Sequence, residues 1–169
     1  MPFLSRVSPD FGIDTASYLT QAGQFWSGQT NITRINGPEG QSFYPAGHLV
    51  HYVPFYLLFK NRMDAFYFLQ LFYIGIYLAI IGLATRVAQI YFKRSPAKAQ
   101  LIGFMLAMNP TQINMVFNYF NDSFVQLYSV ACVYFLINKR PWVGSAMIGM
   151  ALTVKAGALM ALPAILGTI

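Results

Sequence analysis

The chain has 169 residues, of which 56% are hydrophobic and only 9% are charged, and its mean hydropathy is +0.48. Soluble domains usually carry about a quarter of charged residues, so this composition excludes an ordinary water-soluble domain and indicates a membrane protein. The net charge of +6 does not indicate a nucleic-acid partner, because the basic residues form short clusters between apolar segments, as in the cytoplasmic loops of membrane proteins. The single cysteine, Cys132, excludes an internal disulfide.

Residues 1–64 are predicted to form an N-terminal region with interfacial helices, of which residues 1–45 are polar to mixed. Within it, residues 14–28 are expected to be a helix, with Asp14 as its N-cap and apolar residues at helical spacing. Phe25 and Trp26 suit a helix that lies along the interface. The next apolar stretch, residues 46–59, is too short for a predicted span.

Residues 65–169 are predicted to hold four membrane-spanning helices, at about 65–85, 99–117, 123–138 and 142–169. The first half of the first span is rich in aromatic residues, as expected near a membrane interface. The second is interrupted at Asn109-Pro110, a break that is tolerated where protein or water covers it. In the fourth, Ser145 and Gly149 are expected to form a small-residue face for close helix packing.

Loop charge predicts which segments share a side of the membrane. The loops after the first and third spans contain no acidic residue and six basic ones, namely Arg86, Lys93, Arg94, Lys98, Lys139 and Arg140. By the positive-inside rule these two loops are cytoplasmic. The opposite side then receives the end of the fourth span near Lys155 and all five acidic residues, namely Asp10, Asp14, Glu39, Asp64 and Asp122. We therefore expect the polar groups of interest to gather at one membrane face.

Lys155 is the most informative polar residue of the last apolar stretch, since it stands between Trp142–Val154 and Ala156–Ile169. A lysine at membrane depth costs roughly 2.5–3.5 kcal/mol. Two interpretations stay open. The side chain either extends to the interface as a structural residue, or it binds an anion such as a lipid phosphate.

The other polar candidates also allow two interpretations each. Asp14 is either a general base beside apolar surface or a helix N-cap, and Asp122 either belongs to a site or offsets the positive end of a helix. His48 and His51 have a spacing that could hold a metal, but no cysteine or carboxylate stands beside them. They are therefore expected to be ordinary helix-surface histidines, and no metal site is predicted.

Several short motifs point to a known family. The chain contains Gly12-Ile13-Asp14, then Tyr44-Pro45-Ala46-Gly47-His48, then Phe120-Asn121-Asp122, and finally Thr153-Val154-Lys155. In this order and spacing they resemble the motifs of the dolichyl-phosphate-mannose-dependent alpha-1,3-mannosyltransferases of the endoplasmic reticulum, which extend the lipid-linked oligosaccharide for N-glycosylation. The Tyr-Pro-Ala-Gly-His motif is the most specific, and the resemblance covers Ile13 to the C-terminus.

The resemblance implies an all-α, multi-span membrane protein of the GT-C type in the endoplasmic reticulum membrane, with a luminal loop that bears short interfacial helices. It implies an inverting enzyme that transfers mannose from dolichyl-phosphate-mannose to lipid-linked Man5GlcNAc2 in alpha-1,3 linkage. The implied partners are the bilayer, this donor and this acceptor, with no cofactor and no metal. Asp14 is then the expected catalytic base, and the expected substrate-binding residues are Tyr44, His48, Asn121, Asp122 and Lys155.

The chain also departs from the family pattern. Thr15 stands where the family usually has tryptophan, and Ala156-Gly157 replaces Met-Asn. Family members carry a further membrane helix before the aspartate and several after the lysine, so the chain is expected to be a single, truncated domain from the front of the fold. The competing interpretations are an inactive remnant and a non-enzymatic, transporter-like membrane protein. A clustering of polar residues at one face disfavours an ion pathway, which needs them along several helices.

Overall fold

The computed structural model describes residues 13–61, 66–93, 95–161 and 163. Asp10, Asp64 and Arg94 lie outside this part of the chain. The described residues are mostly helical, and the elements in chain order are α1 (Ile13–Trp26), η2 (Ile32–Arg34), β1 (Asn36–Gly37), β2 (Gly40–Gln41), α2 (Ala46–Asn61), α3 (Phe66–Tyr91), α4 (Pro96–Ala107), α5 (Pro110–Phe117), α6 (Asp122–Ile137), α7 (Pro141–Val154) and η4 (Ala156–Ala161).

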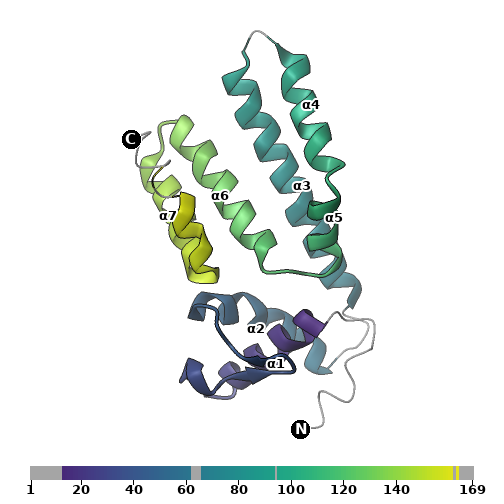
Figure 1. The fold of residues 1–169 in the computed structure, drawn as a ribbon, viewed down its shortest axis with the longest axis vertical. Coiled ribbons are helices and arrows are strands. Elements are labelled where there is room, and N and C mark those ends of the chain that lie inside the picture. The colour runs from purple at the N-terminus through teal and green to yellow at the C-terminus, as the bar shows by residue number, and fades with distance from the viewer. Residues whose placement is uncertain (1–12, 62–65, 94, 162, 164–169) are drawn as a thin grey trace.

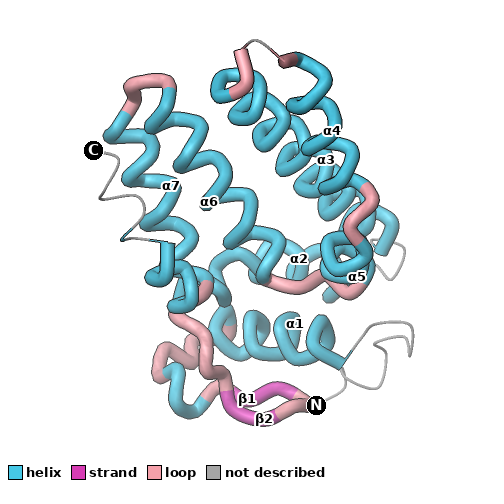
Figure 2. Tube along the Cα trace, turned by 45° about the horizontal axis from the view of Figure 1, so that its top comes forward, coloured by secondary structure: helices cyan, strands magenta, loops and turns pink. Residues whose placement is uncertain are grey.

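The elements form two groups (Figure 1). Helices α3, α4, α6 and α7 run roughly alongside one another, and α6 packs on both α3 and α7. Helices α1 and α2 pack against each other at one end of this bundle. The short antiparallel hairpin β1–β2 lies beside α1 (Figure 2). The N-terminal region therefore caps the end of the bundle at which α5 meets α6 and at which α7 ends.

One helix among the described residues, α3 from Tyr67 to Tyr91, is long and apolar enough to cross a bilayer. The 26 residues of α3 give a length of roughly 39 Å, whereas α6 and α7 are apolar but have 16 and 14 residues. The predicted break at Asn109-Pro110 is confirmed, because α4 ends at Ala107 and α5 begins at Pro110. The Asn109 side chain caps α5 by accepting a hydrogen bond from the backbone N–H of Thr111 at 2.9 Å.

Three sequence-based expectations about helices are wrong. Asp14 is inside the first turn of α1 rather than at its N-cap, since the helix includes Ile13. The helix expected over 142–169 stops at Val154, where Lys155 takes an extended conformation (φ −150°, ψ 126°) and the 3-10 helix η4 follows. The expected small-residue face of α7 does not pack on another helix among the described residues. Ser145 is exposed, and an added Cβ on Gly149 would meet nothing within 4 Å.

The close contact between α6 and α7 uses a neighbouring face of α7 instead. Gly144, Ile148 and Ala151 are buried there, and an added Cβ on Gly144 would lie 2.9 Å from the Leu136 side chain and 3.3 Å from the Cys132 carbonyl oxygen. A small residue is therefore needed at position 144, one residue before Ser145 of the predicted pair Ser145 and Gly149. The helical periodicity was compatible with both faces, and only the position of α6 distinguishes them.

Charge separates along the bundle. The α3–α4 and α6–α7 loops, which carry the basic clusters, lie at the end of the bundle away from α1 and α2 (Figure 1). Described acidic residues occur only at the other end, on α1, on the hairpin turn and at the start of α6. The separation of basic loops from the described acidic residues follows the pattern that loop charge predicted.

We expect Gly47→Ala to destabilise the protein, because Gly47 is where α2 approaches the last turn of α7. An added Cβ would overlap the Thr153 side chain and lie 2.5 Å from its carbonyl oxygen, and overpacking of this kind costs about 1–3 kcal/mol. Thermal unfolding of the purified chain in detergent measures the effect. Gly149→Ala is the matched control, and it should keep or slightly raise the stability because its new methyl group meets no neighbour. Equal midpoints for both variants would contradict the close approach.

Candidate functional site

An ion pair joins the beginning of α6 to the end of α7. The Lys155 Nζ donates a hydrogen bond to the Asp122 Oδ1 at 2.7 Å, and both side chains are about one-third exposed (36% and 31%). Helix α7 ends at Val154, and Lys155 follows it in an extended conformation from which its side chain reaches Asp122. The ammonium group thus has a carboxylate partner and also remains accessible from outside.

The loop that carries Asn121 and Asp122 is anchored from three elements. The carbonyl oxygen of Tyr119 accepts hydrogen bonds from the hydroxyls of Tyr52 on α2, at 2.7 Å, and Tyr73 on α3, at 2.8 Å. The two hydroxyl oxygens are also only 2.6 Å apart. Two hydroxyl protons are therefore shared among three contacts, one between the hydroxyls and one from each hydroxyl to the carbonyl oxygen. Thr15 on α1 is fully buried and donates to the Asn118 carbonyl at 2.9 Å. Tyr119 itself has φ of +53°, a conformation that such contacts must hold in place.

His48 and Asn121 meet beneath the surface. Both are fully buried, and the Asn121 Nδ2 donates to the His48 Nδ1 at 3.3 Å. Burial, with smaller contributions from His51 and the Lys155 charge, lowers the pKa of His48 to about 3. The ring is therefore neutral at physiological pH. The expectation that His48 lies on a polar helix surface is wrong, because α1 and the Asn118–Asp122 loop cover that face of α2.

Aromatic rings connect this buried pair to Lys155 on one side and to α1 on the other. The Tyr44 ring lies 4.7 Å from the His48 ring and has the Lys155 Nζ 6.0 Å from its centre. Tyr18 packs edge-on against both Tyr44 and His48, with centroid distances of 5.8 and 4.7 Å. Lys155, Tyr44, His48 and Tyr18 therefore form one continuous set of contacts.

Asp14 joins the same set through Tyr18. The two residues are four positions apart on α1 and therefore share a face. Burial, then a hydrogen bond with Tyr44, and then the negative charges of Asp14 and Asp122 raise the pKa of the Tyr18 hydroxyl. The Tyr18 hydroxyl therefore stays protonated at physiological pH, and the two carboxylates disfavour its ionisation. Asp14 and the Asp122–Lys155 pair lie on the same side of the bundle.

A second carboxyl group accompanies Asp14. Glu39, on the turn between β1 and β2, has a raised pKa because its carboxyl group hydrogen-bonds to Asp14 and because of desolvation. The Glu39 backbone N–H donates to the Ser17 Oγ at 3.1 Å, and Gly37 packs directly against Ser17. The hairpin is thereby fixed on the first turn of α1.

The structure brings together five of the six residues that the sequence had indicated, namely Tyr44, His48, Asn121, Asp122 and Lys155. The sixth, Asp14, lies one helical turn before Tyr18, which packs on Tyr44 and His48. The structure does not arrange the two histidines as a metal pair, since the His51 ring nitrogens are engaged by the Gly47 carbonyl at 2.6 Å and the Tyr128 hydroxyl at 2.8 Å. Sequence reasoning gave no site role to Thr15, Tyr18, Tyr52 or Tyr73. Tyr18 carried a signal in its place within the family motif and its helical spacing from Asp14, and Thr15 was noted only as a departure from the family.

The arrangement offers complementary groups to a ligand that carries both hydroxyls and a negative charge. The Asp14 carboxylate is half-buried and can accept a proton from a hydroxyl. The Lys155 ammonium has three N–H donors, of which Asp122 takes one, so the others can contact an anion. Tyr44 lies between these groups and supplies an aromatic surface of the kind that carbohydrate or isoprenoid chains can pack on.

Residues 9–169 match the family described as ALG3 protein. The chain belongs to this family. The match to the ALG3 family includes every residue of the site, from Asp14 to Lys155.

Relatives from fungi and insects match the chain over most of its length. A protein of Neurospora crassa named Dol-P-Man:Man(5)GlcNAc(2)-PP-Dol alpha-1,3-mannosyltransferase is 29% identical over 90% of this chain and 34% of its own length. A protein of the same name from Cryptococcus neoformans is 30% identical over 91% of this chain and 36% of its own. Drosophila melanogaster l(2)not2, named as a Dolichyl-P-Man:Man5GlcNAc2-PP-dolichol alpha-1,3-mannosyltransferase, is 25% identical over 91% of this chain and 31% of its own. The chain thus spans about a third of the length of these relatives. No solved structure matches it.

We expect His48 to make the protein less stable as the pH falls. Its pKa is about 3 in the folded state and near 6.5 when unfolded, so above pH 6.5 neither state is protonated there. Between pH 6.5 and 3 only the unfolded chain binds the proton, which lowers the free energy of unfolding by about 2 kcal/mol from pH 7 to pH 5. Thermal unfolding in detergent at these two pH values should show a smaller loss for His48→Gln than for the wild type. Parallel losses would contradict the buried neutral ring.

Proposed function

We propose that this chain forms the front part of a mannosyltransferase that transfers mannose from dolichyl-phosphate-mannose to lipid-linked Man5GlcNAc2, forming an alpha-1,3 bond. The observation that carries the proposal is the chain of contacts from Lys155 through Tyr44 to Tyr18, with Asp14 one helical turn away on α1, in a chain of the ALG3 family. The names of the Neurospora crassa and Cryptococcus neoformans relatives support the same donor and acceptor.

The proposed reaction is a single displacement with inversion. The acceptor hydroxyl oxygen attacks the anomeric carbon of the beta-linked mannose, its proton passes to the Asp14 carboxylate, and the bond to the phosphate oxygen breaks. The electron pair of that bond leaves on dolichyl phosphate, whose added charge Lys155 stabilises. Electrostatic stabilisation of a developing charge usually contributes more to catalysis than any other single effect. The scheme requires no cofactor, because the protein supplies both the base and the cation.

The other indicated residues divide into contact and positioning roles in this proposal. Tyr44 and Asp122 are partly exposed and are placed to contact sugar hydroxyls or the lysine. His48 and Asn121 are buried against each other. They therefore act by fixing the Asn118–Asp122 loop, and a substrate reaches them only if that packing opens.

We further propose that the chain is part of a multi-span protein of the GT-C type in the endoplasmic reticulum membrane, with the site at the luminal face. Helix α3 has the length and apolarity of a span. The basic loops α3–α4 and α6–α7 lie at the far end of the bundle, as the positive-inside rule requires if that end is cytoplasmic. The lipid partners of the reaction then reach the site from the bilayer beside it.

Replacing Asp14 by Asn should strongly reduce mannose transfer, because an amide cannot accept the acceptor's proton. General-base catalysis contributes typically 10²–10⁴-fold, so we expect a loss of about that size. The assay uses a chimera in which this chain replaces the matching third of the Neurospora crassa relative, in microsomes of a strain that lacks the enzyme. Arg86→Gln is the control. Arg86 lies near the end of α3 that is farther from α1, so its replacement should leave transfer unchanged. Near-normal turnover of Asp14→Asn would remove the base assignment, and an unmodified chimera without activity would favour an inactive remnant.

Replacing Lys155 by Met should weaken use of the phosphate-bearing donor far more than use of the acceptor. Methionine keeps much of the apolar stem but removes the charge that faces the leaving group. The same chimera, assayed at varied concentrations of each substrate, should show a fall in kcat/KM for the donor of roughly 10²-fold with little change in KM for the acceptor. Equal effects on both substrates would indicate that Lys155 only holds Asp122 and the end of α7.

A further inference from the structure

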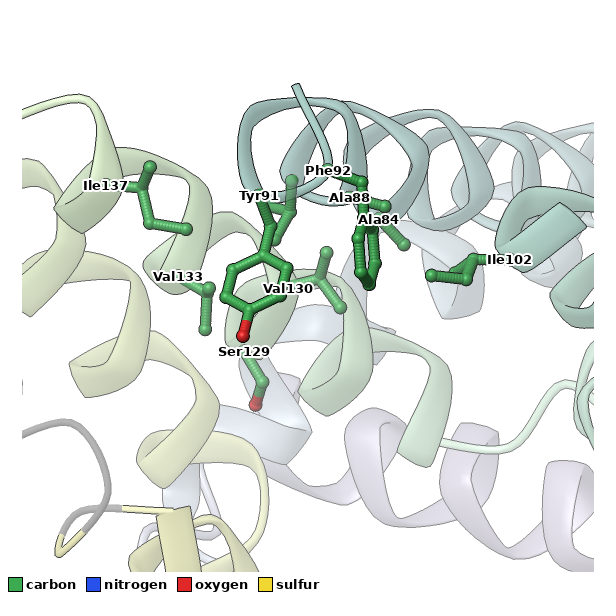
Figure 3. Close-up of a pocket in the computed structure, with 10 residues that line it drawn as sticks. Ala84, Ala88, Tyr91, Phe92, Ile102, Ser129, Val130, Val133 and Ile137 are labelled. Carbon is green, nitrogen blue, oxygen red and sulfur yellow. The ribbon is translucent and has the colours of Figure 1, made fainter. Parts of the chain in front are cut away.

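A large apolar groove lies near the end of the bundle that carries the basic loops, away from the proposed site. Its volume is about 640 Å³, within the range of small-molecule sites. Side chains of α3, α4 and α6 converge on it (Figure 3). The lining consists of aliphatic and aromatic side chains apart from one serine and one tyrosine hydroxyl, and it includes Ala84, Ala88, Phe92, Ile102, Val130 and Val133.

Basic residues occur at this end of the groove, and Lys98 lies against its lining. The Lys98 Nζ lies 5.9 Å from the centre of the Phe92 ring, which lines the groove. Lys93 directly follows Phe92, and Lys139 and Arg140 lie two and three residues after the lining residue Ile137. The sequence contains no acidic residue between Asp64 and Asp122 and none after Asp122. No carboxylate of these segments can therefore neutralise the cations.

We propose that the groove binds an anionic phospholipid, with an acyl chain against the apolar lining and the headgroup beside Lys98 and the neighbouring basic residues. An apolar groove with the Lys98 ammonium at its edge and no carboxylate in the same segments matches both the acyl chain and the anionic headgroup of this ligand. A neutral isoprenoid or a zwitterionic lipid would fill the lining but would make no use of the excess positive charge. The cytoplasmic leaflet, where the proposed topology places these loops, is the leaflet rich in anionic lipids.

Lipid binding at this groove is independent of mannose transfer, and it can be tested on the 169-residue chain itself. The purified chain in mild detergent is titrated with dioleoyl-phosphatidylserine or dioleoyl-phosphatidylcholine, and bound lipid is counted by native mass spectrometry. The wild type should retain phosphatidylserine in clear preference to phosphatidylcholine. Lys98→Gln should lower the affinity for phosphatidylserine about fivefold, the effect of one basic residue at a charged lipid surface, and leave phosphatidylcholine unchanged.

Two further variants separate the charge from the groove. Arg34→Gln removes one exposed basic residue beside α1, at the other end of the molecule, and should not change retention of either lipid. Ala84→Phe fills the groove and should reduce retention of both lipids, with circular dichroism as the check that the variant is folded. Equal retention of the two lipids by the wild type, equal effects of Lys98→Gln and Arg34→Gln, or unchanged retention by a folded Ala84→Phe would each overturn the proposal. The last result is expected if another protein segment or a second copy covers the groove.

Discussion

The site depends on how one backbone carbonyl is held. Tyr119 adopts φ of +53°, which costs a residue with a Cβ roughly 1–2 kcal/mol, and its carbonyl oxygen is buried between the hydroxyls of Tyr52 and Tyr73. A hydrogen bond of this type contributes about 1 kcal/mol, and losing the donors would leave a buried acceptor unsatisfied. The two tyrosines therefore offset the strain. Because they come from α2 and α3, the N-terminal region and the bundle together fix the direction in which the chain enters α6, and with it the position of Asn121 and Asp122.

The ion pair at the start of α6 has a structural role that is compatible with its proposed functional one. Asp122 occupies the first turn of α6, and Lys155 caps the end of α7, so each charge also faces the helix end that favours its sign. The interpretation of Asp122 as a residue that offsets a helix terminus is thus correct and does not compete with a place in the site. The same applies to Lys155, whose structural contact with Asp122 leaves part of the ammonium group exposed.

The sequence was sufficient for features that composition and charge determine, and insufficient for those that packing determines. Loop charge placed Asp122 and Lys155 on one side of the membrane, and the structure pairs them at 2.7 Å. The end of α7 at Val154 was missed because an apolar run contains no signal for a break that serves a tertiary contact. Thr15 was noted only as a departure from the family, since its bond to Asn118 joins residues 103 positions apart. The burial of His48 was missed for the same reason, as the elements that cover it lie far away in the chain.

The partial neutralisation of Lys155 by Asp122 bears on how the proposed chemistry could discriminate the transition state from the bound donor. A free lysine would attract the phosphate of the intact donor strongly, and stabilising the ground state and the transition state equally does not accelerate the chemical step. With one N–H held by Asp122 at 2.7 Å, the pair carries no net charge, and its attraction for an intact phosphodiester is reduced. As the bond to mannose breaks, the phosphate gains negative charge, and the remaining N–H donors of Lys155 interact more strongly with it. A lysine paired with an acid therefore suits a leaving group whose charge grows during the reaction better than an unpaired lysine does.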